Sequence, residues 1–203
     1  MLDGMMRQII DAPLNRAGQW LAARGWRADA VTLIGLGFGL AAALVLARGW
    51  PGGLALVLVL VSRLADGLDG AIARATRKTD FGGYLDITAD FLFYGAIPLA
   101  FALRDPANAP AAAFLLCSFY VNGASFLGYA VLAQKHGLQT AARGEKSLYF
   151  TAGLLEGTET IGFFVALCIW PGAFNLLAPV FGALCFVTAL SRVMLARRVF
   201  GRR

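Results

Sequence analysis

Residues 52–103 read GGLALVLVLVSRLADGLDGAIARATRKTDFGGYLDITADFLFYGAIPLAFAL, and this stretch decides the fold. Two apolar runs, 52–73 and 82–103, flank a short charged loop. Each run has about the length of the roughly 20 apolar residues that a helix needs to cross a bilayer. Because the loop between them is short, we expect two membrane-spanning helices that lie side by side and antiparallel.

Four further apolar runs, at about 30–46, 109–133, 148–170 and 174–195, have similar lengths. The chain is 59% hydrophobic and 15% charged, whereas soluble domains are roughly 45–50% apolar and about 25% charged. The runs are continuous and do not alternate as the strands of a membrane β-barrel do. The sequence therefore predicts an all-α integral membrane protein with six transmembrane helices.

The segment before the first run has the pattern of an interfacial amphipathic helix. Leu14, Ala17, Trp20 and Leu21 share one predicted helical face, and polar residues occupy the other. Tryptophan is typical of the headgroup layer of a bilayer, and helices of this kind lie in the plane of the membrane surface. The predicted organisation is an N-terminal interfacial helix at 1–29, a six-helix transmembrane catalytic domain at 30–195 and a basic tail at 196–203.

The basic residues predict the orientation in the membrane. Lys and Arg number 18 and Asp and Glu 12, a formal net charge of +6. Most of the basic residues lie in the N-terminal segment, in the loops after the second and fourth runs, and in the tail. Because Lys and Arg accumulate in cytoplasmic loops, both termini are predicted to be cytoplasmic, in a bacterial inner membrane. The charge indicates contact with membrane lipids and no nucleic-acid partner.

Four aspartates lie where a bilayer makes charge expensive. Asp66 and Asp69 are three positions apart near the end of the second run, and Asp86 and Asp90 are four apart near the start of the third. Each pair therefore shares one helical face. Both pairs fall at the same membrane depth, where four carboxylates repel one another unless a cation lies between them. Oxygen ligands of this kind suit Mg²⁺ or Mn²⁺, and ionisable residues inside a span are usually functional.

The segments DGLDGAIAR, from Asp66 to Arg74, and GGYLDITAD, from Gly82 to Asp90, resemble the DxxDGxxAR…GxxxDxxxD signature of the CDP-alcohol phosphotransferase (CDP-alcohol phosphatidyltransferase) family. The loop between the two segments is one residue shorter than the pattern usually has, which leaves the helix faces undisturbed. The ADAVT sequence at 28–32 is similar to the PNxVT of the family. Together with the six-run layout, these motifs extend the resemblance over most of the chain.

The resemblance implies a function and roles for the motif residues. Members of the family are six-span membrane enzymes, commonly homodimers, that transfer a substituted phosphate from a CDP-linked donor to an alcohol. The expected reaction moves a phosphatidyl group from CDP-diacylglycerol to a small alcohol and releases CMP. Two ions of Mg²⁺ or Mn²⁺ per site are implied. The implied ligands are Asp66, Asp69, Asp86 and Asp90, the implied base is Asp90, and the implied nucleotide and phosphate cradle is Gly70, Ala73, Arg74 and Gly82.

The acceptor alcohol stays open between glycerol phosphate, inositol phosphate and an amino alcohol or serine. An acceptor with its own phosphate needs further cations, for which Arg63, Arg143 and Lys146 are candidates. Glu156 and Glu159, on the fifth run, could pair with Arg63, hydrogen-bond a polyol, hold a cationic amine, or form a structural buried pair. Burial without partners would be costly.

Further polar residues have simpler expected roles. Ser118, Asn122 and Ser125 share a face of the fourth run and could line the same cavity, although polar contacts between helices are the commoner use of such residues. His136 is expected to be solvated and inert.

Two other functions fit an aspartate-rich membrane protein. A membrane prenyltransferase also uses acidic motifs and Mg²⁺, but its two motifs lie far apart in a longer chain. A divalent-cation transporter would place the acids near the bilayer midplane and show an internal repeat with broken helices. The compact block of residues 66–90 near the interface favours the phosphotransferase.

Overall fold

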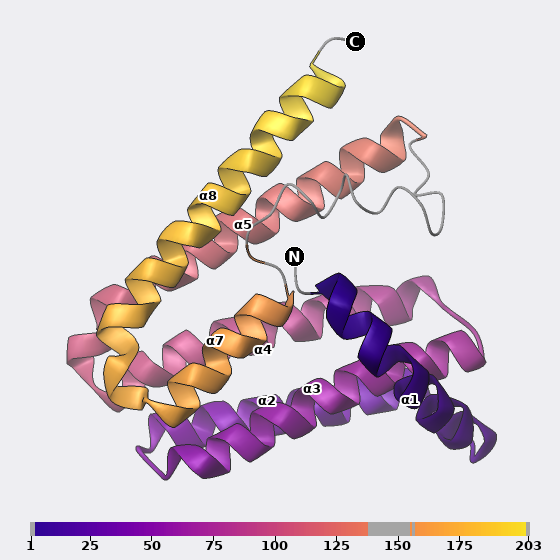
Figure 1. Ribbon diagram of the computed structural model, residues 1–203, viewed down its shortest axis with the longest axis horizontal. Helices are drawn as coiled ribbons and strands as arrows, with labels where there is room; N and C mark the ends of the chain where they lie inside the picture. Colours follow the sequence, from indigo (N-terminus) through magenta and orange to yellow (C-terminus); the bar gives the residue numbers. More distant parts are fainter. Residues whose placement is uncertain (1–2, 138–154, 156, 202–203) are drawn as a thin grey trace.

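The computed structural model describes residues 3–137, 155 and 157–201 of the chain (Figure 1). Its elements follow in the order α1 (Asp3–Ala23), α2 (Ala28–Ala47), α3 (Gly52–Ala75), α4 (Asp80–Arg104), η1 (Pro106–Asn108), α5 (Ala109–Lys135), α7 (Gly157–Ile169), η2 (Pro171–Ala173) and α8 (Phe174–Phe200). Every element in these residues is helical, which confirms the all-α class.

Four of the helices are long and apolar enough to cross a membrane. The mean hydropathy is 2.3 for α2 and 1.4 for α4. It is 1.5 for α5 taken together with η1, and 2.0 for α8 taken together with η2. Helix α3 has the length, but charged side chains interrupt the second half of its apolar run. Helix α7 has 13 residues, and the predicted run 148–170 lies partly outside the described residues. The count of six spans stays a prediction.

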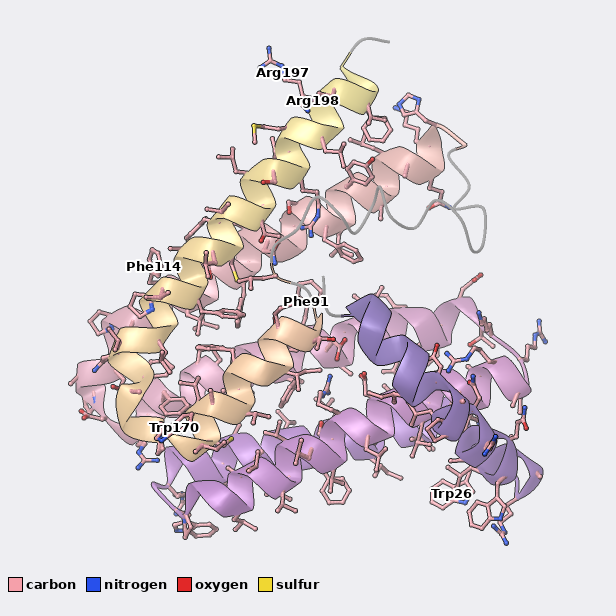
Figure 2. The ribbon with its side chains drawn as sticks, in the orientation of Figure 1. Trp26, Phe91, Phe114, Trp170, Arg197 and Arg198 are labelled. Carbon is pink, nitrogen blue, oxygen red and sulfur yellow. The ribbon has the colours of Figure 1, made fainter. Side chains whose placement is uncertain are left out.

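The outer faces of the helices are apolar, as expected of surfaces that contact lipid. Large hydrophobic side chains with about half or more of their surface exposed occur on every long helix from α2 to α8; examples are Leu44, Val57, Leu64, Leu92, Leu99, Tyr120, Val131, Val180 and Leu190. Trp26 and Trp170 lie at opposite ends of the molecule (Figure 2). Tryptophans at both ends are typical of a membrane protein, where they occupy the two headgroup layers.

Glycines allow α2 to pack closely on α3 and α4. A Cβ atom at Gly35 would lie 2.9 Å from the Cβ of Ala65, and one at Gly39 would lie 2.6 Å from the Phe93 ring. Both positions are buried. Small residues at such crossings let backbones approach within membranes. The close contact aligns the N-terminal end of α2 with the C-terminal half of α3 and the first turns of α4, where the site lies.

Aromatic contacts join α7 to the rest of the bundle. The rings of Phe93 in α4 and Phe164 in α7 meet edge to face with their centroids 5.5 Å apart, and Phe163 stacks on Phe181 of α8 at 4.2 Å. Such pairs contribute roughly 0.5–1.5 kcal/mol beyond the area they bury. Helices α5 and α8 run side by side along most of their length (Figure 1).

Helix α1 packs across α3 through a face that contains Gly18. Gly18 is buried against Ala71, and the Leu14 side chain lies over Gly67. Trp20 is 57% exposed and Ala17 is also exposed. The face of α1 that packs on α3 is therefore centred on Gly18 and leaves Ala17 and Trp20 outside the contact, and the interfacial role of α1 stays a prediction.

The tips of α5 and α8 meet beyond the predicted end of the sixth run. Helix α8 continues to Phe200, so the predicted tail boundary at 196 falls inside a helix. The Phe200 ring stacks on His136 with centroids 5.3 Å apart, and it meets Tyr129 edge to face at 5.3 Å. His136, which was expected to be solvated, is half-buried, because the extended α8 brings an aromatic ring to it.

Candidate functional site

The site lies where the end of α3, the start of α4 and the start of α2 converge. Thr79 caps α4, since its Oγ1 accepts a hydrogen bond of 3.0 Å from the Gly82 backbone N–H. This cap sets the first turn of α4 and thereby the helical face on which Asp86 and Asp90 lie. Helix α3 ends at Ala75, so a loop of only four residues, 76–79, holds the two helices together at this end.

Three of the four motif aspartates form a carboxylate cluster. Asp66 of α3 and Asp86 and Asp90 of α4 each offer an oxygen atom, and these atoms all lie within 4.8 Å of one another. All three residues are half-buried. Hard oxygen donors at such spacing suit a divalent cation of the Mg²⁺ or Mn²⁺ type. The cluster therefore meets the chemical requirement of the predicted metal site.

Arg63, one turn before Asp66, points its guanidinium into this carboxylate cluster. Its Nη1 donates to Asp90 Oδ1 at 2.7 Å and lies 3.4 Å from Asp66 Oδ1. Its Cζ lies 4.3 Å from the centre of the Phe93 ring. The sequence analysis proposed Arg63 as an acceptor ligand, and the structure places it against two of the aspartates.

Asp69, the fourth aspartate, turns toward α2. Thr32 donates its hydroxyl to Asp69 Oδ2 at 2.5 Å. Both residues are buried, with Asp69 5% and Thr32 7% exposed. Asp69 is not among the three carboxylates of the cluster, but it lines the same pocket as Asp86.

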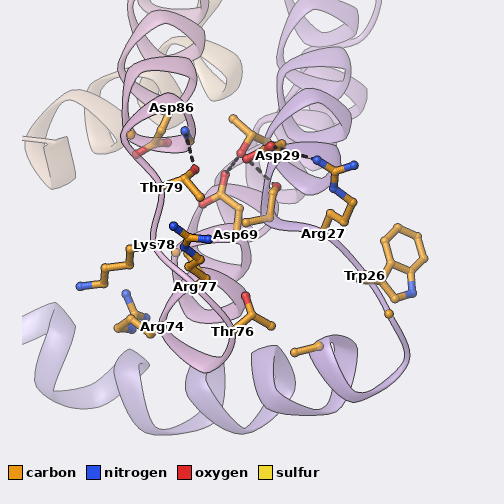
Figure 3. A pocket seen from close by; sticks show the side chains of 18 residues that line it. Trp26, Arg27, Asp29, Asp69, Arg74, Thr76, Arg77, Lys78, Thr79 and Asp86 are labelled. Carbon is orange, nitrogen blue, oxygen red and sulfur yellow. Dashed lines mark hydrogen bonds and ion pairs between the residues drawn. The ribbon is translucent and has the colours of Figure 1, made fainter.

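An open pocket of about 570 Å³ lies over Asp69 and Asp86. Figure 3 shows its acidic floor and the basic side chains around it. It collects every residue that the resemblance assigned to the nucleotide and phosphate cradle, namely Gly70, Ala73, Arg74 and Gly82. The pocket also has room for a nucleotide-sized ligand, since binding sites for small molecules are typically about 300–1,000 Å³.

Glycine at position 82 keeps this pocket open. A Cβ atom there would lie 3.0 Å from Thr79 Oγ1 and 3.2 Å from Asp29 Oδ1. Any larger residue would therefore push against the α4 cap and against the first turn of α2. A backbone without a side chain also allows a phosphate to approach closely.

Basic side chains surround the pocket. Arg27, Arg77 and Lys78 line it together with Arg74, whose Nε and Nη2 donate to Asn15 Oδ1 of α1 at 3.1 and 2.9 Å. This contact fixes Arg74 from the side of α1. A pocket with an acidic floor and a basic rim is suited to a diphosphate bound together with a cation.

The sequence did not single out Arg27, Asp29, Thr32, Arg77 and Lys78 as site residues. Arg77 and Lys78 were counted only toward membrane orientation, although they directly follow the motif. The other three lie in or next to the ADAVT stretch at the start of α2. The similarity of that stretch to the family pattern was the available signal for them.

The predicted acceptor residues fall into two groups. Arg143, Lys146 and Glu156 lie outside the described residues, whereas Glu159 lies half-buried in the first turn of α7. The polar face of α5 contacts a neighbouring helix. Asn122 and Ser125 accept hydrogen bonds from Nη1 of Arg192, an arginine of α8 that is 9% exposed, at 3.0 and 2.8 Å. Of the two uses considered for this face, the structure shows the contact between helices.

Comparison with known proteins identifies the family. The family model of the CDP-alcohol phosphatidyltransferases matches residues 26–194. The chain is 45% identical over 194 residues to the inner membrane protein YnjF of Escherichia coli (strain K12), covering 95% of this chain and 94% of that protein. It is 31% identical over 174 residues to the archaetidylinositol phosphate synthase of Pyrococcus horikoshii, covering 81% and 89%.

Solved structures share the fold. A crystal structure of Mycobacterium tuberculosis phosphatidylinositol phosphate synthase with CDP-DAG bound gives a TM-score of 0.70 at 22% identity, covering 91% of this chain and 93% of that one. A structure of the same synthase in complex with manganese and citrate gives a TM-score of 0.62 at 21% identity, covering 90% and 88%. With its apolar helices and its signature motif, the chain is an integral membrane protein of the CDP-alcohol phosphatidyltransferase family.

Proposed function

We propose that the protein transfers a phosphatidyl group from CDP-diacylglycerol to the hydroxyl of a small alcohol and releases CMP. The observation that carries this proposal is the pairing of the carboxylate cluster with the basic-rimmed pocket, which share Asp86. The relative crystallised with CDP-DAG and with manganese supports both the donor and the cation.

The residues of the site divide the chemistry between them. The four motif aspartates, Asp66, Asp69, Asp86 and Asp90, would hold two divalent cations, Mg²⁺ or Mn²⁺. When bound, such cations would neutralise the negative charge of the donor diphosphate and of the leaving CMP. Arg74, Arg77 and Lys78 would bind the phosphates of the donor from the pocket rim. Gly70, Ala73 and Gly82 leave space for the nucleotide.

Asp90 is the proposed base. The acceptor oxygen forms a bond to the phosphorus that carries diacylglycerol, the acceptor proton passes to Asp90, and the bond from that phosphorus to the CMP oxygen breaks. CMP leaves with the electron pair of that bond. Positioning and charge stabilisation account for most of the catalysis in such a reaction, and little covalent chemistry is left to the protein.

The relatives suggest which acceptor to test first. The archaeal relative and the mycobacterial structural relative are both named as inositol phosphate lipid synthases. Inositol phosphate therefore precedes glycerol phosphate, serine and ethanolamine as the proposed acceptor. Glu159 and, outside the described residues, Arg143, Lys146 and Glu156 remain the proposed acceptor ligands.

We further propose a six-span homodimer in the bacterial inner membrane with both termini in the cytoplasm. The name of the Escherichia coli relative supports the location. The basic loops and tail support the orientation. The proposed domain layout is an interfacial helix at 1–29, a transmembrane catalytic domain at 30–195 and a basic C-terminal segment at 196–203, which begins within α8.

The reaction is tested with purified protein in lipid nanodiscs that contain CDP-diacylglycerol. CMP and the lipid product are measured with Mn²⁺ or Mg²⁺ and each acceptor in turn. Asp90→Asn should abolish CMP release, whereas Asp80→Asn, an exposed position on the same helix outside the pocket, should not. No CMP with any acceptor would refute the proposal. Diphosphate release from a prenyl diphosphate would indicate the prenyltransferase, and Mn²⁺ uptake into liposomes without CMP would indicate the transporter.

A further inference from the structure

The side chain of Arg63 occupies part of the carboxylate cluster. Its Nη1 bonds to Asp90 Oδ1 at 2.7 Å and lies 3.4 Å from Asp66 Oδ1, so one guanidinium edge faces two of the three clustered carboxylates. Because Asp90 Oδ1 carries this bond, only its second oxygen is free of Arg63. The arginine thus takes up carboxylate oxygen that a cation would otherwise use.

Arg63 is held firmly in this position. Its side chain is only 10% exposed. Nη2 donates to Ser62 Oγ at 3.2 Å, and Cζ lies over the Phe93 ring at 4.3 Å. Hydrogen bonds on one side and an aromatic face on the other hold this buried arginine beside the carboxylates. Its charge therefore lies next to the carboxylates that would hold a cation.

The formal charges of the four aspartates and Arg63, counted without the basic rim of the pocket, show what this arginine does. The four aspartates carry four negative charges and Arg63 carries one positive charge. One divalent cation leaves the site negative by one, and a second would make it positive by one. The donor diphosphate restores a negative balance. Without Arg63, two cations would only neutralise the aspartates.

We infer that Arg63 is the internal counter-ion of this site, which holds Asp90 in place and weakens binding of the second cation until the donor diphosphate is present. Arg63 is then a positioning residue, and it does not bind the acceptor. The inference rests on the proposed function, since it takes the aspartates as cation ligands. It goes further in making cation loading depend on the donor.

The test measures Mn²⁺ binding to purified protein in nanodiscs, by the electron paramagnetic resonance signal of free Mn²⁺, with and without CDP. Three variants are compared with wild type: Arg63→Met, Arg63→Gln and Arg63→Lys. The matched control is Arg48→Met, because Arg48 is exposed and lies at the C-terminal end of α2, away from the site. CMP release is measured in parallel with varied acceptor.

Without CDP, both neutral variants should bind the weaker Mn²⁺ at least about ten-fold more tightly than wild type, equivalent to about 1.4 kcal/mol. CDP should then tighten Mn²⁺ binding less than it does in wild type. Arg63→Lys should keep wild-type Mn²⁺ affinity, because it keeps the charge, but should lower kcat, because an ammonium lacks the planar group that Ser62 and Phe93 hold against Asp90. The acceptor KM should not change in any variant. If Arg63→Met does not fold, Arg63→Gln carries the test, since its amide can still donate to Asp90.

Unchanged or weaker Mn²⁺ affinity in a folded neutral variant would overturn the inference. A higher acceptor KM with unchanged Mn²⁺ affinity would overturn it in favour of an acceptor ligand. Wild-type protein that binds no Mn²⁺ would refute the metal site of the proposed function and the inference with it. Wild-type protein that binds Mn²⁺ and releases CMP, with neutral variants that bind Mn²⁺ equally well, would refute the inference alone.

Discussion

Replacing Thr32 with valine tests whether α2 contributes to the catalytic site. The Thr32 hydroxyl donates to Asp69 Oδ2 at 2.5 Å, and both residues are buried. Valine has nearly the same shape but cannot donate, so one carboxylate oxygen loses its donor inside the protein. Hydrogen bonds to charged groups contribute about 1.5–3 kcal/mol. That range corresponds to about 10- to 150-fold in a binding constant.

We expect Thr32→Val to weaken Mn²⁺ binding by about ten-fold or more and to lower kcat/KM for CDP-diacylglycerol to a similar extent. Asp69 lines the pocket beside Gly70, so a carboxylate that loses its orientation disturbs both the cation and the donor. The assays are Mn²⁺ titration and CMP release against donor concentration. Thr32→Ser keeps the hydroxyl and should behave like wild type.

Thr88→Val supplies a control on an exposed surface, since the Thr88 hydroxyl donates only to the Tyr84 carbonyl of its own helix, at 2.8 Å. Equal activity and equal Mn²⁺ affinity of Thr32→Val and wild type would refute the role of this hydrogen bond. Equal losses in Thr32→Ser and Thr32→Val, with lowered thermal stability in both, would show that packing matters there and the hydroxyl does not.

Four other predictions concern helix packing, the pocket rim, the cation and the acceptor. Gly39→Ala should lower the free energy of unfolding by about 1–3 kcal/mol, because its Cβ would lie 2.6 Å from the Phe93 ring. Gly37→Ala is the control: its Cβ meets no atom within 4 Å, and the variant should unfold at or above the wild-type temperature. The double variant Arg77→Ala/Lys78→Ala should raise the KM for CDP-diacylglycerol about three- to ten-fold, and the increase should be larger at low salt. Arg198→Ala, at the far end of α8, is the control and should leave this KM unchanged (Figure 2). Chelation by EDTA should abolish CMP release and added Mn²⁺ should restore it, and activity that survives chelation would contradict the metal site. Glu156→Gln or Glu159→Gln should change the acceptor KM and leave the donor KM unaltered, as measured by varying each substrate separately.

Local sequence patterns predicted the helices well. The predicted run 30–46 corresponds to α2 at Ala28–Ala47, and 52–73 corresponds to α3 at Gly52–Ala75. Apolar runs bounded by glycine, proline and charge are sufficient for this, because a helix satisfies its backbone hydrogen bonds within its own segment. The same reasoning put the aspartate pairs on single faces, since the spacing of three or four residues is a property of one helix.

Such local patterns could not predict the contacts between helices. Nothing in the spacing of α1 indicated that Gly18 would face Ala71, and nothing near His136 indicated that Phe200 would stack on it. Both depend on how closely two helices approach and how far a helix extends past its apolar run. These quantities are decided by side chains on the partner helix.

The sequence by itself determined the class of protein, the helices and the motif that carries the chemistry, because hydropathy, length and residue spacing are local properties. Only the tertiary structure decided how the four aspartates divide. Asp66, Asp86 and Asp90 cluster together, and Arg63 contacts the first and the last of them, while Asp69 turns to Thr32. The partner that a buried carboxylate meets depends on the crossing of α2, α3 and α4, and glycines at those crossings allow the approach that brings the partners within bonding distance.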